Sequence, residues 1–91
     1  MSLSRDVTEW FAHVDALLAN GRLEYEEVKA LSDQGYALMY KLKALAVKNE
    51  RYALKGGSFA EAFEKEAKLY RKRAEEIRDT IDELWEAFKR R

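Results

Sequence analysis

One histidine and four serines are the side chains in this sequence that could take part in metal or nucleophilic chemistry. Glu9 lies four residues before His13, which puts both on one side of a helix. Two ligands do not make a metal site, and the Glu-x-x-His spacing of di-iron bundles is absent. Ser32 could approach His13 across a turn, but no oxyanion-hole signature accompanies it. We therefore expect no enzyme activity, no metal, no cofactor and no small-molecule substrate.

Basic side chains gather in residues 41–73, which hold ten basic and four acidic residues, a net charge of +6. The rest of the chain holds seven basic and thirteen acidic residues, or −6, so a neutral chain is strongly bipolar. A basic surface with Tyr52 and Tyr70 nearby suits RNA phosphates or an acidic protein surface. The candidate nucleic-acid-binding residues are Lys48, Arg51, Lys55, Lys65, Lys68, Arg71 and Lys72.

Length and composition limit the classes of protein to which this chain can belong. Its 91 residues allow one domain with a modest core, spanning 1–91. Zero net charge argues against a polycation that coats nucleic acid, and the absence of Cys excludes a disulfide framework. No apolar stretch is long enough to cross a membrane, and we expect no secretory signal. We expect a cytoplasmic protein without a membrane partner.

The chain has no proline, so glycine is the only residue type that would interrupt a helix. The glycines divide the sequence into three predicted helices at 4–19, 23–55 and 58–90. Asn20-Gly21 is typical of a helix end and a turn. Gly56-Gly57 precedes a Ser-x-x-Glu capping box that begins at Ser58. Gly35 could mark a further turn, which would give four helices, but the heptad pattern favours a continuous helix.

Both long predicted helices carry apolar residues at alternating spacings of three and four, as coiled coils do. If the chain folds back at Gly57–Ser58, the numbers of facing residues add up to 115 or 116 all along both rows. The pattern predicts an all-α fold, an antiparallel, coiled-coil-like helical hairpin. Its rows are Val28, Leu31, Gly35, Leu38, Leu42, Leu45, Asn49 and Tyr52 against Phe63, Ala67, Tyr70, Ala74, Ile77, Ile81, Leu84 and Phe88.

The predicted helix at 4–19 is amphipathic but shorter than the hairpin. At ~1.5 Å per residue it reaches back only to about Tyr40. We therefore expect a three-helix bundle at the base of the hairpin and two helices at its tip. The main core of this bundle is predicted to contain Trp10, Phe11, Val14, Ile81, Trp85 and Phe88.

An apolar strip on the second predicted helix extends beyond the reach of the first. An uncovered apolar strip often marks an interface, although single exposed apolar residues are common. It predicts a homodimer, such as a head-to-tail pair with basic tip on acidic base, or binding of a partner protein helix. The strip consists of Met39, Tyr40, Ala46, Val47, Ala53 and Leu54.

We therefore expect a non-enzymatic helical interaction or assembly module, such as an adaptor, a chaperone-like protein or a scaffold. The alternative is an RNA-binding helical arm that uses the basic tip. In outline the predicted hairpin resembles small secretion chaperones and tRNA-binding coiled-coil arms. The Trp-x-Gly turn of secreted helical hairpins is absent, because neither Trp10 nor Trp85 is followed by glycine two residues later.

Overall fold

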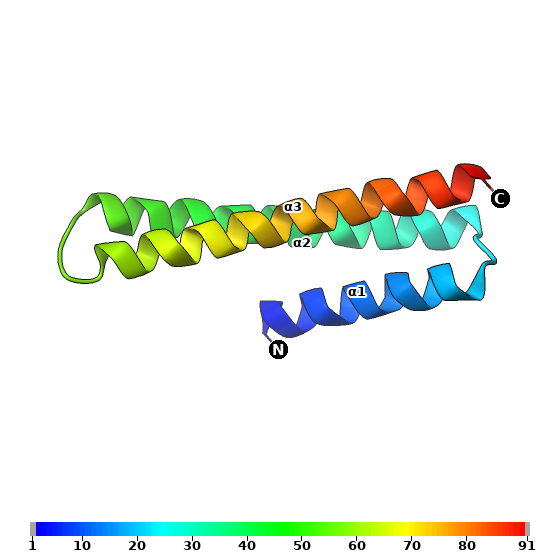
Figure 1. Ribbon diagram of the computed structural model, residues 1–91, viewed down its shortest axis with the longest axis horizontal. Helices are drawn as coiled ribbons and strands as arrows, with labels where there is room; N and C mark the ends of the chain where they lie inside the picture. The colour runs from blue at the N-terminus through cyan, green and yellow to red at the C-terminus, as the bar shows by residue number, and fades with distance from the viewer. Residues whose placement is uncertain (1, 91) are drawn as a thin grey trace.

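The computed structural model describes residues 2–90, which form three helices and no strand. They are α1 (Leu3–Asn20), α2 (Tyr25–Leu54) and α3 (Ala60–Arg90). The all-α hairpin is confirmed, and each helix end lies within two residues of its predicted position. The molecule is a rod of 52 × 24 × 17 Å, in which α2 and α3 run antiparallel along the whole length (Figure 1).

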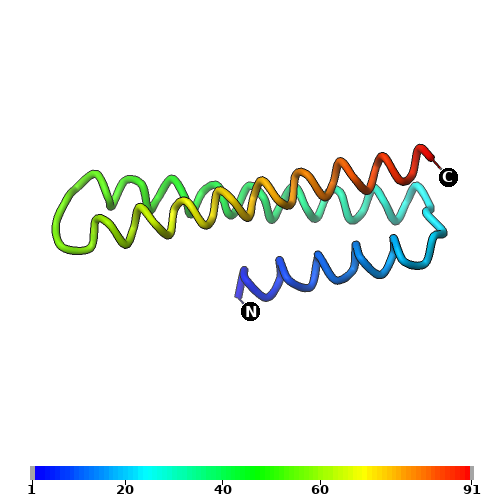
Figure 2. Tube along the Cα trace, viewed as in Figure 1, coloured from blue at the N-terminus to red at the C-terminus, as the bar shows by residue number. Residues whose placement is uncertain are grey.

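The short helix α1 lies beside only one half of this hairpin. Its C-terminal end adjoins the turn into α2, close to the end of α3, and its N-terminal end stops near the middle of the rod (Figure 2). We call the half covered by α1 the base and the half that contains the α2–α3 turn the tip. The tip is two helices thick, as predicted from the length of α1.

Local signals in the sequence explain where the helices begin and end. The Ser2 hydroxyl accepts a 3.2 Å hydrogen bond from the Arg5 amide and caps α1. The turn between α2 and α3 uses Gly56 (φ 76°) and Gly57 (φ 95°), in the left-handed region that side chains disfavour. α3 begins two residues beyond the predicted cap, with the Ala60 amide donating to the Gly57 carbonyl at 3.3 Å.

Two contacts show that the hairpin has the predicted register. The rings of Tyr52 and Phe63 lie 5.1 Å apart near the tip. Towards the base, a Cβ atom added at Gly35 would lie 2.8 Å from Cδ1 of Ile81. Gly35 therefore lies inside the continuous helix α2, as the heptad pattern predicted, and not in a turn.

The row of α2 that faces α3 differs from the predicted one. Val28, Gly35 and Leu42 are buried as expected, but Ser32, Met39 and Ala46 complete the buried row in place of Leu31, Leu38 and Leu45. The physical reason is side-chain size. Small residues are buried on both helices, among them Ala46 of α2 and Ala74 of α3, and the distance between packed helices depends on the side chains between them. The predicted leucines lie one row away, where α2 meets α1 or the open groove.

The base is held by Trp10 of α1, whose indole lies directly on the backbone of α2. Its Nε1 donates a 2.7 Å hydrogen bond to the Leu31 carbonyl. A Cβ atom at Gly35 would lie only 2.6 Å from Cζ2 of this indole. Glycine at position 35 therefore provides the space in which α1 is seated.

Trp85 packs against the core from α3, and the six residues predicted for the main core all belong to this core or pack against it. Its Nε1 donates to the Ser32 hydroxyl at 3.1 Å, and its ring packs with Tyr25 (5.9 Å) and Phe88 (5.7 Å). Trp10 packs instead with Phe11 at 5.0 Å. The core of the base thus includes two aromatic groups, which are joined to α2 at the Leu31 carbonyl and at the Ser32 hydroxyl.

A methyl group at Gly35 should destabilise the fold although it improves helix propensity. We expect Gly35→Ala to lower the free energy of unfolding by about 1–2 kcal/mol, because the new Cβ overpacks Trp10 and Ile81. Chemical denaturation measures this change. At the exposed control position, Ala37→Gly should cost about 1 kcal/mol from propensity alone. If Gly35→Ala stabilises the protein by a similar amount, the close contact with Trp10 does not exist.

Candidate functional site

The residues that the sequence offered for chemistry are not brought together. His13 is exposed on α1, and Ser32 is buried with its hydroxyl bonded to Trp85. Within residues 2–90, no group of three or more His, Cys, Asp or Glu side chains is arranged to hold a metal ion.

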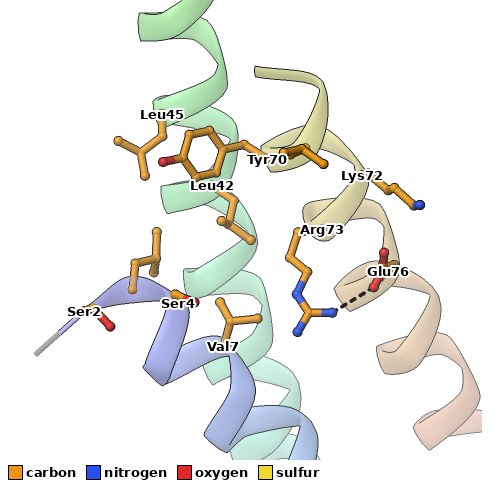
Figure 3. A pocket seen from close by; sticks show the side chains of 11 residues that line it. Ser2, Ser4, Val7, Leu42, Leu45, Tyr70, Lys72, Arg73 and Glu76 are labelled. Carbon is orange, nitrogen blue, oxygen red and sulfur yellow. Dashed lines mark hydrogen bonds and ion pairs between the residues drawn. The ribbon is translucent and has the colours of Figure 1, made fainter. Parts of the chain in front are cut away.

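The most developed cleft lies where α1 ends against the middle of the hairpin. It has a volume of about 550 Å³, which is in the range of sites that hold a ligand or a large side chain. Figure 3 shows Val7 of α1, Leu42 and Leu45 of α2 and Tyr70 of α3 around it. Its floor is apolar because these residues belong to the same rows that α1 covers further towards the base.

Beyond this cleft the same rows continue towards the tip without a third helix. Tyr52 lies seven residues after Leu45, and Phe63 lies seven before Tyr70, so each continues the row of its helix. The rings of Tyr52 and Phe63 pack on each other at 5.1 Å on this surface, and Leu69, which also lines the cleft, is 64% exposed. We call this surface, formed by Leu45, Tyr52, Phe63, Leu69 and Tyr70, the tip groove.

The α2 wall of the tip groove carries a row of lysines. Lys41, Lys48 and Lys55 are spaced seven residues apart, next to the apolar row that contains Leu45 and Tyr52. The Lys55 ammonium lies 5.4 Å from the centre of the Tyr52 ring, a cation–π contact. Within residues 2–90, none of the three lysines forms an ion pair within 4.0 Å.

The α3 wall is mixed in charge, and two of its groups are engaged, whereas Lys72, which also lines the cleft, forms no ion pair within residues 2–90. Arg73 donates to Glu76 at 2.9 Å, drawn as a dashed line in Figure 3, and lies over the Phe11 ring at 4.6 Å. The Tyr70 hydroxyl donates to Glu66 at 3.0 Å, and this bond to a carboxylate raises the pKa of Tyr70. Unpaired positive charge therefore lies on both walls, as the row of Lys41, Lys48 and Lys55 on α2 and as Lys72 on α3.

The strip predicted on α2 is divided between the interior and the surface. Tyr40 (63% exposed), Val47 (39%) and Leu54 (87%) are exposed, as predicted, and we call these three residues the α2 strip. Met39 and Ala46 are buried in the hairpin and Ala53 is half-buried. The prediction that Met39 and Ala46 are open to a partner is wrong, because their row faces α3.

The candidate RNA-binding residues are all exposed at the tip, but helical periodicity distributes them around it. Lys48 and Lys55 belong to the lysine row of the tip groove. Arg71 lies on the other side, where its guanidinium donates to both carboxylate oxygens of Glu50 at 2.7 Å. The other exposed members of the set are Arg51, Lys65, Lys68 and Lys72, of which Lys72 is among the residues that line the cleft in Figure 3.

The Glu50–Arg71 pair joins α2 to α3 on the side of the hairpin opposite the tip groove. Its two parallel bonds are the preferred geometry of an arginine and a carboxylate. The hydrogen bond from Arg71 lowers the pKa of Glu50, and the same bond raises the pKa of Arg71. Both side chains are about half exposed, so solvent screens this pair.

Sequence reasoning missed the tip groove, although Leu45, Tyr52, Phe63 and Tyr70 were all identified as seam residues. The signal was the leucine row at positions 31, 38 and 45, which continues to Tyr52 beyond the reach of α1. The row of Ser32, Met39 and Ala46 beside it fits a heptad equally well. The heptad pattern alone favours the more apolar leucine row for the contact with α3. The structure shows that the neighbouring row makes this contact.

Comparison with known proteins does not assign a function to this surface. No protein-family description, curated protein or solved structure matches the chain. None of the helices within residues 2–90 is both long enough and apolar enough to cross a membrane. The geometry and charge of the hairpin are therefore the basis for a functional proposal.

The ion pair across the tip should be visible as a titration shift. We expect the Glu50 carboxyl to titrate below its ordinary pKa in the wild type and to return to the ordinary value in Arg71→Gln. Since folding lowers this pKa, the pair contributes stability above the ordinary pKa and loses its contribution as the pH falls through the lowered value. Carboxyl carbon chemical shifts measure both titrations. An unchanged Glu50 titration in Arg71→Gln would contradict the assigned bond.

Proposed function

We propose that this protein is a non-enzymatic helical interaction or assembly module of the adaptor, chaperone-like or scaffold type. It binds a partner helix, or a second copy of itself, through the apolar surface that α1 leaves uncovered on the hairpin. The observation that carries the proposal is the extent of α1. This helix fills the groove between α2 and α3 at the base only, and the same apolar rows remain open at the tip.

The structure of the base supports a helix as the ligand of the tip groove. There α1, an amphipathic helix, places Val7, Trp10 and Val14 against α2 and α3, and all three are buried. The tip offers the same two rows to a second helix, without a change in the hairpin. Helix-in-groove binding is a common mode of protein recognition.

Self-association is the second form of the same proposal. The α2 strip lies outside the tip groove and presents Tyr40, Val47 and Leu54 at heptad spacing. In a head-to-tail dimer through this strip, the basic tip of one copy would lie beside the acidic base of the other. The charge of the chain thus favours this arrangement over a parallel dimer.

RNA binding is the alternative function, and the unpaired lysines at the tip favour it. Lys48, Lys55, Lys65, Lys68 and Lys72 are exposed and form no ion pair within residues 2–90. Such lysines can contact phosphates.

The interaction proposal predicts two separable effects of charge in the apolar surfaces. If the protein self-associates, sedimentation at hundreds of micromolar should show dimers, and Val47→Glu should dissociate them. If it binds a partner helix, display selection should enrich helical peptides, and Leu69→Glu should no longer bind them. Both side chains are exposed, so the variants should keep the fold, which circular dichroism checks. A wild-type protein that stays monomeric and selects no helical peptide over scrambled sequences would contradict the proposal.

The RNA alternative predicts a different dependence on salt and charge. Binding of a single-stranded oligonucleotide should weaken by about tenfold or more between 50 and 200 mM salt, because each phosphate contact releases counterions. It should weaken further in the Lys68→Gln/Lys72→Gln variant and remain unchanged in Val47→Glu. Filter binding or fluorescence anisotropy measures these affinities, and no binding at about 50 mM salt excludes the alternative.

A further inference from the structure

We infer that the tip groove binds an amphipathic helix from another protein, with acidic side chains along the edge that faces α2. This inference rests on the proposed function and specifies the chemistry of the partner. It follows from the way α1 fills the base of the same groove, from the lysine row on α2 and from the surfaces that a second copy of this chain can offer.

Helix α1 shows how an amphipathic helix packs along these rows of the hairpin. At its N-terminal end Leu3 contributes to the cleft together with Leu42 and Leu45. A helix that follows α1 along the groove would meet the row from Leu45 to Tyr52 next. From Leu45 to the end of α2 this row extends for about 15 Å, enough for about three helical turns.

The cleft lies at the inner end of the groove, beside the N-terminal end of α1. Its 550 Å³ lie between the side chains of three helices and exceed the volume of any single side chain. Val7 and Leu42 at its floor are nearly inaccessible, whereas Leu69 at its edge is 64% exposed. Large apolar side chains of the incoming helix would enter this space and exclude water from the floor, as anchor residues of interfaces do.

The acidic side chains of α1 match the lysine row of α2 in charge. On α1, Asp6 lies beside the same shallow surface groove as Lys41 and Lys48, and Glu9 lies beside another with Lys41. The edge of α1 that faces α2 is thus acidic where it meets the first lysine of the row. The row continues with Lys48, near the N-terminal end of α1, and with Lys55 towards the tip, and within residues 2–90 neither lysine has an acidic partner within 4.0 Å. An acidic edge on the incoming helix would supply it.

A second copy of this chain does not provide the helix that fills the tip groove. If two copies filled each other's tip grooves, the two tips would overlap, and each carries a net charge of +6. Within residues 2–90, the large apolar side chains exposed outside 41–73 are three tyrosines of α2, namely Tyr25, Tyr36 and Tyr40. The acidic base therefore offers no exposed aliphatic row to the leucine-lined groove.

The groove also fits a helix better than it fits RNA. Its inner end is lined by one aromatic residue, Tyr70, and by four leucines, namely Leu3, Leu42, Leu45 and Leu69, whereas bases of single-stranded RNA stack on aromatic rings. A nucleic acid would use the lysines and leave this aliphatic surface exposed. An amphipathic helix uses both the lysine row and the apolar floor.

The test is a titration of the full chain with two labelled peptides. Each is a stapled helix of about 14 residues with leucines in a heptad row, one with glutamates and the other with lysines along both edges. Fluorescence anisotropy should show that the acidic peptide binds at least about tenfold more tightly, and that this preference shrinks as salt rises to about 500 mM. Leu69→Glu should remove binding of the acidic peptide.

Variants of the chain distinguish the lysine row from the general charge of the tip. Lys48→Glu/Lys55→Glu should weaken binding of the acidic peptide about tenfold. The matched control is Lys43→Glu/Lys68→Glu, which changes the net charge equally on the side of Tyr40 and Arg71. The control should change the affinity by no more than about twofold, because long-range attraction alone is weak at physiological salt.

The outcomes also separate this inference from the proposed function. Equal binding of both peptides, or equal losses in both lysine variants, overturns the acidic partner but leaves a helix-binding module. If neither peptide binds while the chain dimerises through Val47, the inference fails and the assembly function stands. If a single-stranded RNA displaces the acidic peptide and binds Leu69→Glu unchanged, the lysine row belongs to RNA and the inference is wrong.

Discussion

The contact between the Trp10 indole and the backbone at Gly35 determines where α1 lies on the hairpin. The indole needs the space that an absent side chain leaves, and its Nε1 is bonded to the Leu31 carbonyl one turn earlier. Both requirements are met at one position along α2. Since α1 has 18 residues and α2 has 30, this position leaves the distal part of the hairpin two helices thick. The cleft, the tip groove and the proposed partner site all follow from that arrangement.

The architecture could be predicted from the sequence because three independent signals agree. The heptads of the second and third helices and the Gly56-Gly57 turn specify one hairpin, and a long heptad pattern rarely arises by chance. The buried face of α3 was predicted correctly, because this helix has a single apolar row. The face of α2 was not, since α2 packs against two helices and carries two adjacent apolar rows. Choosing between them requires the distance between helix axes, which depends on small residues of both partners such as Ala46 and Ala74.

The candidate site was harder to predict than the fold. An open apolar surface and a basic tip were both expected, and the exposure of Tyr40, Val47 and Leu54 agrees with the structure. The tip groove depends on where α1 ends relative to Leu45, which only the Trp10 contact establishes. The lysines that line the groove could be separated from the rest of the basic segment only after the rows of α2 were assigned. Charge counts along a sequence say where cations gather, whereas helical rows say which surface they share.

The two tryptophans report on different parts of the molecule. Trp10 is 3% exposed and joins α1 to the hairpin, whereas Trp85 is half-buried and joins α3 to Ser32 of α2. Detachment of α1 alone would bring the first indole into water and leave the second in place. The protein therefore contains two intrinsic fluorophores whose emission can distinguish fraying of the short helix from separation of the long pair.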